Sequence, residues 1–330
     1  MSNRLPRSQA TMAMATAVFV LSLAACGGSS GGSGAVAAGN EGGEETTAIV
    51  VGVQPFAVVV PFYVAMERGM FEDAGLEVTT QGATSGAPLV SAMVAGEVDI
   101  ANANYVSLIQ AASEGLPLRA IRENDRADVQ GLYAGPASGI SSPADLAGKR
   151  VAINGLGNIA ELTTRAALEE NGVDPDSVQF VELPLPDMPA ALASGNVDAA
   201  WLAEPFVTMT ADSMQAALVL DTSTGPTEDF PISGWMSSAQ FAEENPEALA
   251  AFVEVMDEAI ALVADDPSLV AETVPSFTTI SPEVAAKLAP INWAVDSDLQ
   301  RLRTVEELMR EYGVLQEEYD VDEIIINPGG

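Results

Sequence analysis

The feature that most constrains the fold is a regular alternation of short β-rich runs with amphipathic helical runs between residues 49 and 202. The expected strands are 49–54, 76–81, 99–103, 150–154, 178–183 and 198–202. The expected helices are 62–71, 87–95, 105–114, 160–171, 188–194, 246–264, 282–288 and 298–312. Because parallel strands need a long crossover, this alternation predicts parallel α/β sheets with right-handed connections.

A short internal sequence repeat links two parts of this series. The segment 91–101, SAMVAGEVDIA, is matched by 190–200, AALASGNVDAA. In both segments a helix of small residues ends at a glycine, Gly96 or Gly195, and an aspartate, Asp99 or Asp198, opens the next strand. The repeat predicts two α/β lobes built on one plan.

The first residues have the layout of a secretory signal. Arg4 and Arg7 precede an apolar run over 12–23, which is shorter than the roughly 20 residues that a membrane-spanning helix needs. The sequence Leu-Ala-Ala-Cys then ends at Cys26, which is the only cysteine in the chain. This motif resembles the lipobox of bacterial lipoproteins, so residues 1–25 are expected to be removed and Cys26 to carry lipid.

Residues 26–47 are rich in Gly, Ser, Ala and Glu and predict a flexible tether. The remainder, about 280 residues, exceeds the usual size of a single core and favours two domains. The formal net charge of −34 disfavours nucleic acid and anionic lipid as partners, because the electrostatic interaction would be repulsive. No cofactor or metal is expected, and the chain is expected to be a monomer.

Three segments carry a family resemblance, namely 61–78, 145–152 and 191–205. They resemble, in the same order, segments of the ABC-importer binding lipoproteins for nitrate, sulfonates, taurine and thiamine pyrimidine precursors (the NMT1/THI5-like family). The resemblance implies a type II periplasmic-binding-protein fold: two α/β lobes, joined by crossovers expected at 132–136 and 221–233, with the ligand cleft between them. Lobe 1 would comprise 48–134 and 234–330, and lobe 2 would comprise 135–233.

The same resemblance implies a function in import. An exported protein, anchored at the outer face of the cytoplasmic membrane, would capture a small organic molecule and deliver it to an ABC permease with its own ATPase. This chain contains no Walker motif, so the ATPase is expected to be a separate chain.

Two rival functions are also compatible with parts of the sequence. The glycines at 155 and 157 follow an expected strand and open an expected helix, as in a dinucleotide-binding loop, but they suit a ligand loop equally well. An enzyme on the same fold is the other alternative. The chain has no histidine, and no Ser or Cys stands in a nucleophile motif, so catalysis is not expected, although carboxylates remain available as acid or base.

Ligands of open α/β sheets bind beyond the carboxyl ends of the strands. Applied to the expected strands, this rule gives the candidate ligand-binding residues Gln54, Phe56, Thr84, Ser85, Asn104, Tyr105, Asn158, Met188 and Glu204, and Trp235 is added as a lid residue. Several have an ordinary structural alternative: Thr84, Ser85, Asn104 and Asn158 are also suitable helix caps, and Phe56 and Met188 are also suitable core residues.

The loops selected in this way contain no Lys, Arg or His, whereas they contain Asp187 and Glu204. A doubly charged anion would be poorly compensated there, while a carboxylate with aromatic faces suits an amine or a protonatable ring. The sequence therefore favours a neutral or cationic heterocycle, such as a pyrimidine precursor, over a sulfonate or nitrate-type anion, with Glu204 as the carboxylate that meets it.

Overall fold

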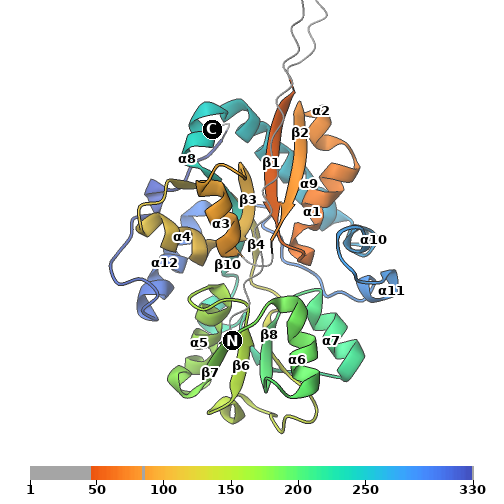
Figure 1. Cartoon of the computed structure of the whole chain (residues 1–330), viewed down its shortest axis with the longest axis vertical. Coiled ribbons are helices and arrows are strands. Elements are labelled where there is room, and N and C mark those ends of the chain that lie inside the picture. The colour runs from red at the N-terminus through yellow and green to blue at the C-terminus, as the bar shows by residue number, and fades with distance from the viewer. Residues whose placement is uncertain (1–45, 84–85, 329–330) are drawn as a thin grey trace, which may run out of the picture. The chain divides into compact units, whose positions relative to one another are not determined.

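The computed structural model describes residues 46–83 and 86–328. The expected signal sequence, the lipid-bearing Cys26 and nearly all of the tether lie outside the described residues, as do Thr84 and Ser85. The remaining sequence forms two five-stranded sheets with helices on their faces (Figure 1).

The first sheet has the strand order β2-β1-β3-β10-β4. Its strands are β1 (Thr47–Val53), β2 (Leu76–Gly82), β3 (Ile100–Asn104), β4 (Leu118–Arg126) and β10 (Pro231–Ser238). Strand β1 is parallel to β2 and to β3, whereas β10 is antiparallel to both of its neighbours. The parallel pairs carry the crossover helices that the alternation of strands and helices predicts.

The second sheet has the order β7-β6-β8-β5-β9. Its strands are β5 (Gly131–Ala134), β6 (Arg150–Ile153), β7 (Gln179–Glu182), β8 (Ala199–Leu202) and β9 (Ala217–Asp221). Here β6 is parallel to β7 and to β8, and β5 is antiparallel to both of its neighbours. The two sheets therefore share one plan, in which a single antiparallel strand is the fourth in order.

The repeat seen in the sequence corresponds to equivalent positions of the two sheets. The carboxylate of Asp99 accepts a hydrogen bond from the backbone N–H of Val50 on β1 (2.8 Å), and the carboxylate of Asp198 accepts one from Arg150 on β6 (2.9 Å). Each aspartate thus joins the start of the central strand of its sheet, β3 or β8, to the neighbouring strand β1 or β6.

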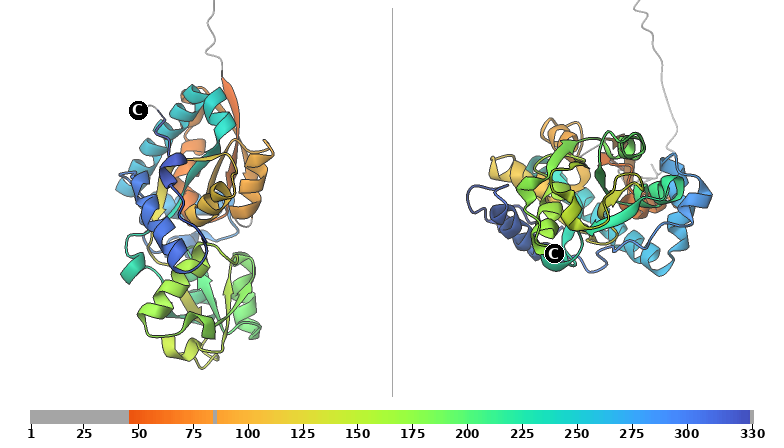
Figure 2. Two further views of the ribbon diagram at one scale, coloured as in Figure 1. Left: turned by 90° about the vertical axis from the view of Figure 1, so that its left-hand side faces the viewer. Right: turned by 90° about the horizontal axis from the view of Figure 1, so that it is seen from below.

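Helices cover both faces of the first sheet. On one face lie α1 (Val60–Glu67), α2 (Met70–Asp73), α8 (Ala239–Glu244), α9 (Pro246–Asp265), α10 (Ser268–Phe277) and α11 (Pro282–Ala285). On the other face lie α3 (Gly86–Val94), α4 (Tyr105–Ser113) and α12 (Leu302–Glu311). The C-terminal segment returns to this sheet, where α12 packs beside α4 and Ile325 bridges to Ala120 (Figures 1 and 2).

The second sheet packs with α5 (Ile159–Glu170), α6 (Met188–Ser194) and α7 (Phe206–Met214) around a core of its own. The chain passes from the first sheet to the second at residues 127–130 and returns at 222–230. The first of these passages lies earlier than the expected 132–136, because Leu132 and its neighbours pair with β8 and β9 inside the second sheet. Whether each sheet with its helices moves as a separate lobe stays a prediction.

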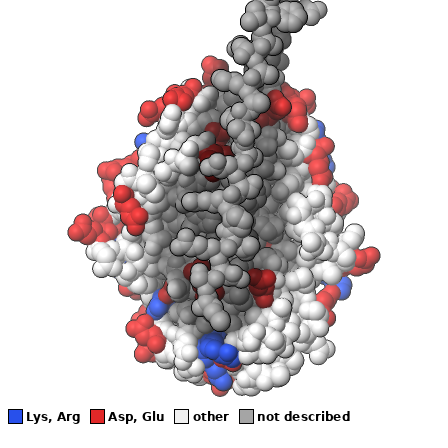
Figure 3. Space-filling view, viewed as in Figure 1, with Lys and Arg blue, Asp and Glu red and all other residues white. Residues whose placement is uncertain are grey.

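Two further features complete the description. Among residues 46–83 and 86–328, no helix combines the length and the apolar character needed to cross a membrane. On the face seen in Figure 3, acidic side chains are spread around the periphery and basic ones are few, as expected for a net charge of −34.

Candidate functional site

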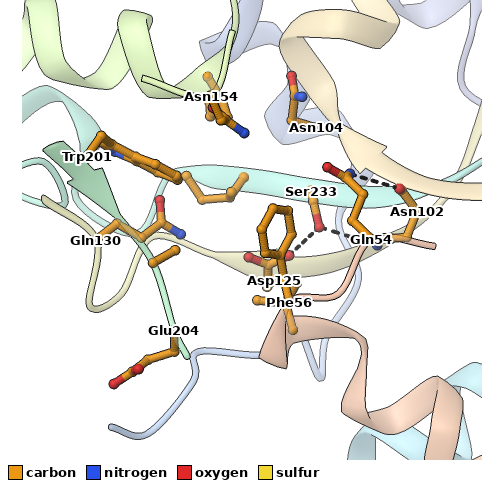
Figure 4. Close-up of a pocket in the computed structure, with 14 residues that line it drawn as sticks. Gln54, Phe56, Asn102, Asn104, Asp125, Gln130, Asn154, Trp201, Glu204 and Ser233 are labelled. Atoms are coloured by element: carbon orange, nitrogen blue, oxygen red, sulfur yellow. Dashed lines mark hydrogen bonds between the residues drawn. The ribbon is translucent and has the colours of Figure 1, made fainter. Parts of the chain in front are cut away.

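A cavity of about 50 Å³ lies between side chains that come from both sheets. From the first sheet it receives residues at the ends of β1, β3 and β4 and at the start of β10, and from the second sheet residues that follow β6 and β8 (Figure 4). These are the carboxyl ends of the parallel strands in each sheet, where ligands of α/β proteins bind. The cavity is therefore the candidate ligand site.

Three neighbouring strands place polar side chains in a row at one wall of this cavity. In the register of the sheet, Ser233 on β10 is the partner of Asn104 on β3 and of Asp125 on β4. The Ser233 hydroxyl donates a hydrogen bond to Asp125 Oδ1 and accepts one from the amide of Asn102 at 3.3 Å. The β10–β4 pairing has register irregularities on both sides of Ser233, and such bulges turn side chains out of the regular pleat.

Asp125 is fully buried, and only one of its two carboxyl oxygens has hydrogen-bond partners among the described residues. Its Oδ1 atom also accepts a hydrogen bond from the amide of Asn124 at 3.2 Å, whereas Oδ2 has no hydrogen-bond partner among the described residues. The pKa of Asp125 is raised to about 8, mainly because burial disfavours the charged form and in smaller part because the carboxylates of Asp128 and Glu123 lie nearby. At neutral pH the ligand-free protein therefore holds Asp125 mostly as the neutral acid.

The second sheet contributes another buried polar atom without a partner among the described residues. The indole of Trp201 on β8 lines the cavity, and its Nε1–H has no acceptor among the described residues. Beside it the wall contains Gln130, from the first connection between the sheets, and Asn154, which follows β6. The side-chain oxygen of Asn154 accepts a hydrogen bond from Asn158 at 2.8 Å, which fixes its orientation.

Glu204, the carboxylate that the sequence analysis assigned to the ligand, has protein partners for both oxygens. Oε1 accepts hydrogen bonds from the Thr208 hydroxyl (2.7 Å) and from the backbone N–H of Ala289 (3.0 Å), and Oε2 accepts one from the Thr208 N–H (3.1 Å). Figure 4 shows its carboxylate pointing away from Asp125 and Ser233. Glu204 lines the cavity, but its carboxylate joins α7 to the segment after α11.

Of the other predicted site residues, the structure brings Gln54, Phe56 and Asn104 to the cavity wall. The side chain of Asn104 also caps α4 by accepting a hydrogen bond from the Ser107 N–H at 2.9 Å. Asn158 caps α5 in the same way, through Ala160 and Glu161, and reaches the cavity only through its bond to Asn154.

Three predicted site residues lie in the cores instead. Tyr105 is fully buried, and its hydroxyl donates to the carbonyl of Arg122 at 3.3 Å. Trp235 is fully buried among aromatic side chains, with its indole N–H bonded to Asn124 at 3.0 Å, and Met188 is buried in the core of the second sheet. The polar atoms of Tyr105 and Trp235 are hydrogen-bonded inside the protein, and none of the three residues lines the cavity.

Sequence reasoning did not single out Asp125, Trp201, Gln130 or Ser233. Asp125 stands in the sequence Arg-Glu-Asn-Asp-Arg, which has the composition of an exposed loop but forms the end of the buried strand β4. Trp201 lies within the expected strand 198–202, whereas the rule of strand ends selects the residues that follow that strand. The rule of strand ends would have found Asp125 if β4 had been predicted.

The cavity wall contains two acidic side chains, five carboxamides and one hydroxyl. No Lys or Arg belongs to the described residues that line it. The remaining lining side chains are apolar, and Phe56 and Trp201 provide aromatic surfaces. This composition suits a ligand with hydrogen-bonding groups and little net negative charge.

Two α/β sheets of this shared order, with a polar cavity between them, define the class of the protein as the type II periplasmic-binding-protein fold, which confirms the expected fold class. The model of the NMT1/THI5-like family matches residues 57–269, well over half of the chain. The chain therefore belongs to the NMT1/THI5-like family, as its sequence resemblance implied.

Individual proteins match this chain at low sequence identity. A protein of Brucella abortus, provisionally described as a binding protein, is 28% identical over 201 residues, which are 59% of this chain and 60% of that protein. The chain thus spans less than two thirds of the length of the relatives that match it first. The taurine-binding periplasmic protein of Escherichia coli K12 is 28% identical over 249 residues, covering 73% of this chain and 72% of that protein.

Among solved structures, the alkanesulfonate-binding protein SsuA from Xanthomonas axonopodis pv. citri superposes with a TM-score of 0.72. The superposition covers 86% of this chain and 99% of that protein, at 18% sequence identity. At this identity the likeness establishes the fold alone and leaves the ligand open.

Proposed function

We propose that this protein is the extracytoplasmic solute-binding protein of an ABC importer. The observation that carries the proposal is the buried polar cavity at the strand ends of both sheets, which lets two α/β units contact one small molecule at the same time. Membership of the NMT1/THI5-like family and the names of the relatives support it. The binding of the small molecule would close the units on each other, and a permease with its ATPase would receive the closed form.

Export and lipid anchoring belong to the same proposal and rest on the sequence of the first 26 residues. The first testable prediction is that Cys26→Ser releases the protein from membranes, because the acyl chains attached to this cysteine are what holds it there. Membrane and soluble fractions of expressing cells are compared by immunoblotting. Ser29→Ala, three residues downstream, is the control that keeps the anchor. Equal membrane retention of the Cys26→Ser variant and the parent would contradict the lipid anchor.

The ligand is proposed to be a small molecule with at most one negative charge. A neutral or cationic heterocycle, such as a pyrimidine precursor, fits a wall with two acids, aromatic faces and no Lys or Arg among its described residues. A sulfonate or nitrate-type anion is the second candidate, which the names of the taurine-binding and alkanesulfonate-binding relatives favour. Asn104 and Ile159 line the cavity at the start of α4 and α5, where helix N-termini favour one oxyanion.

An enzyme on the same fold is the alternative function. A general base with a pKa near neutrality is present in Asp125, but the one hydroxyl among the described residues that line the cavity, that of Ser233, is hydrogen-bonded to that acid. We therefore propose binding without chemical conversion.

The experiment has two steps. Small molecules released from the purified, denatured protein are identified by mass spectrometry, and a panel containing them with pyrimidines, sulfonates, amines and nitrate is screened by thermal shift. A ligand that binds the folded state raises Tm with its concentration. Recovery of the compound unchanged after incubation supports a binding protein, whereas its turnover would favour the enzyme. If no member of the panel raises Tm, the proposed function fails.

A further inference from the structure

Two buried polar atoms with opposite hydrogen-bonding character line the cavity without a partner among the described residues. One is Oδ2 of Asp125 on the first sheet, which is an acceptor when the acid is ionised, and the other is the donor Nε1–H of Trp201 on the second sheet. Both side chains are buried, with 0% and 3% of their surface exposed. An unpaired buried group is costly, so each atom indicates a group that a ligand would supply.

We propose that Asp125 Oδ2 binds a protonated amine of the ligand, and that Trp201 Nε1 donates a hydrogen bond to an acceptor atom of the same molecule. The inference rests on the proposed function and deepens it. It moves the recognition of a cation from Glu204 to Asp125. The ligand class is then a small organic molecule that carries an ammonium or amidinium group, with a remainder that is neutral or carries one negative charge.

The surroundings of Asp125 favour a cation over a neutral donor. Its neighbours on and after β4 include the carboxylates of Glu123 and Asp128, and Glu204 lies across the cavity. Arg122 and Arg126, the basic side chains of this part of β4, are bonded to Asp257 and Glu123. From α4 only the Tyr105 hydroxyl approaches, and it is bonded to a carbonyl. A ligand cation would therefore be the counter-charge of the site.

Binding of this kind is linked to a proton. In the ligand-free protein Asp125 is mostly neutral below pH 8, because burial raises its pKa to about 8. An ammonium ligand keeps its own protons and favours the carboxylate, so Asp125 releases one proton to the solvent when the ligand binds. Its affinity should then rise with pH up to about pH 8, by at most tenfold per pH unit. An anion held by the neutral acid would show the opposite trend.

Matched pairs of probes separate these possibilities. Taurine and isethionate differ in an ammonium against a hydroxyl group, and so do benzylamine and benzyl alcohol. Dissociation constants for all four are measured by calorimetry at pH 6.5 and 8, with the full chain as parent and as Asp125→Asn. Asn keeps the shape of the side chain and removes the charge. We expect the ammonium member of at least one pair to bind the parent at least tenfold more tightly than its hydroxyl partner does. We also expect its affinity for the parent to be at least about tenfold higher at pH 8 than at pH 6.5.

In Asp125→Asn the preference for the ammonium member should fall by at least tenfold and its pH dependence should disappear. Glu123→Gln is the matched control, since it removes a buried carboxylate from the same strand that does not line the cavity, and it should keep the preference even if it lowers Tm. Equal or tighter binding of isethionate or benzyl alcohol, or affinity for the ammonium member that falls as the pH rises, would overturn the inference while leaving the proposed function standing. If the wider panel also contains no ligand, the proposed function fails and the inference fails with it.

Discussion

Asp125 differs from the other acidic residues because it is fully buried beside a cavity and has one unpaired oxygen. Its pKa of about 8 lies well above the usual value of about 4 for an unfolded chain. Between these two values the folded protein binds a proton that the unfolded chain has released. The contribution of this group to the free energy of unfolding is therefore fully present below about pH 4 and is lost as the pH rises to about 8.

The second testable prediction follows from this sign. Asp125→Asn removes the titration, so the free energy of unfolding of the variant minus that of the parent should increase from pH 5 to pH 8, by up to about 1.4 kcal/mol per pH unit. Urea unfolding of ligand-free protein at several pH values measures this difference. Asp128 titrates nearby with a pKa raised to about 6, so the interval from pH 7 to 8 reports Asp125 most directly. A difference that is constant with pH would contradict the raised pKa.

At the residue scale, part of the site was predictable. The rule that ligands bind at strand ends selected Gln54, Phe56 and Asn104, because their strands had clear apolar patterns. The rule also selected Tyr105, which is buried in a core, as is Trp235, the residue added as a lid. An aromatic residue near a strand end can turn inward, and only the packing decides. Glu204 was selected for its sequence context, but its carboxylate has partners that lie far away in the sequence, near Ala289.

The element that the sequence hid most completely is β4. Its residues Arg122, Glu123, Asn124 and Asp125 are all buried. The strand is possible because the buried charges of Arg122 and Glu123 are paired with Asp257 and Arg126, and because the raised pKa of Asp125 keeps that acid mostly neutral. A strand whose buried residues are charged or polar cannot be recognised from the spacing of apolar residues in the sequence. The expected strands and crossover helices, by contrast, were found within a few residues, because they alternate apolar runs with strong helix signals.

The antiparallel strand β10 depends on a close approach to its neighbours, which gives the third prediction. A Cβ atom at Gly234 would lie 2.0 Å from the Tyr105 hydroxyl oxygen and 2.7 Å from the carbonyl oxygen of Arg122. Gly234→Ala should therefore lower the free energy of unfolding by about 1–3 kcal/mol through overpacking. Thermal and urea unfolding of the variant measure this loss.

The control for this prediction is Gly82→Ala, at the end of β2, where an added Cβ meets no heavy atom of the described residues within 4 Å. Its effect should stay within about 0.5 kcal/mol. If both alanine variants were equally stable, β10 would not lie as close to β4 and to Tyr105 as the structure has it.

For the whole molecule, the shared order of the two sheets has a consequence for binding. Each connection between the sheets leads directly into an antiparallel strand, β5 or β10, and Asp125 and Ser233 lie next to these connections. A rotation of one sheet against the other would therefore act close to the ligand-binding wall. The sequence predicted the common plan from its internal repeat, whereas the contacts between the two halves depend on residues far apart in the chain.

Glu204 forms the best defined of these contacts. Its backbone carbonyl accepts a hydrogen bond from Ala57 beside the first sheet (3.3 Å), and its carboxylate accepts one from Ala289 in the C-terminal part (3.0 Å). The Tyr312 hydroxyl of the C-terminal part also donates to Glu169 on α5 at 2.7 Å. If closure on the ligand depends on Glu204, this residue affects the binding of every ligand equally. Asp125, by contrast, affects the binding of ligands that carry an ammonium or amidinium group.

The fourth prediction tests this difference. Glu204→Gln weakens a charge-assisted hydrogen bond that holds the two halves together, so the affinity for every ligand should fall by a common factor of about ten or more, whatever the charge of the ligand. Small-angle scattering should show the radius of gyration of the parent decreasing with ligand, and the variant should need a higher ligand concentration for the same decrease. Asp212→Asn is the control, since its exposed ion pair with Lys287 contributes about 0–1 kcal/mol and its loss should change affinity little. A radius of gyration unchanged at saturation would argue for a rigid site, and a loss of affinity confined to ammonium ligands would return the role of cation partner to Glu204.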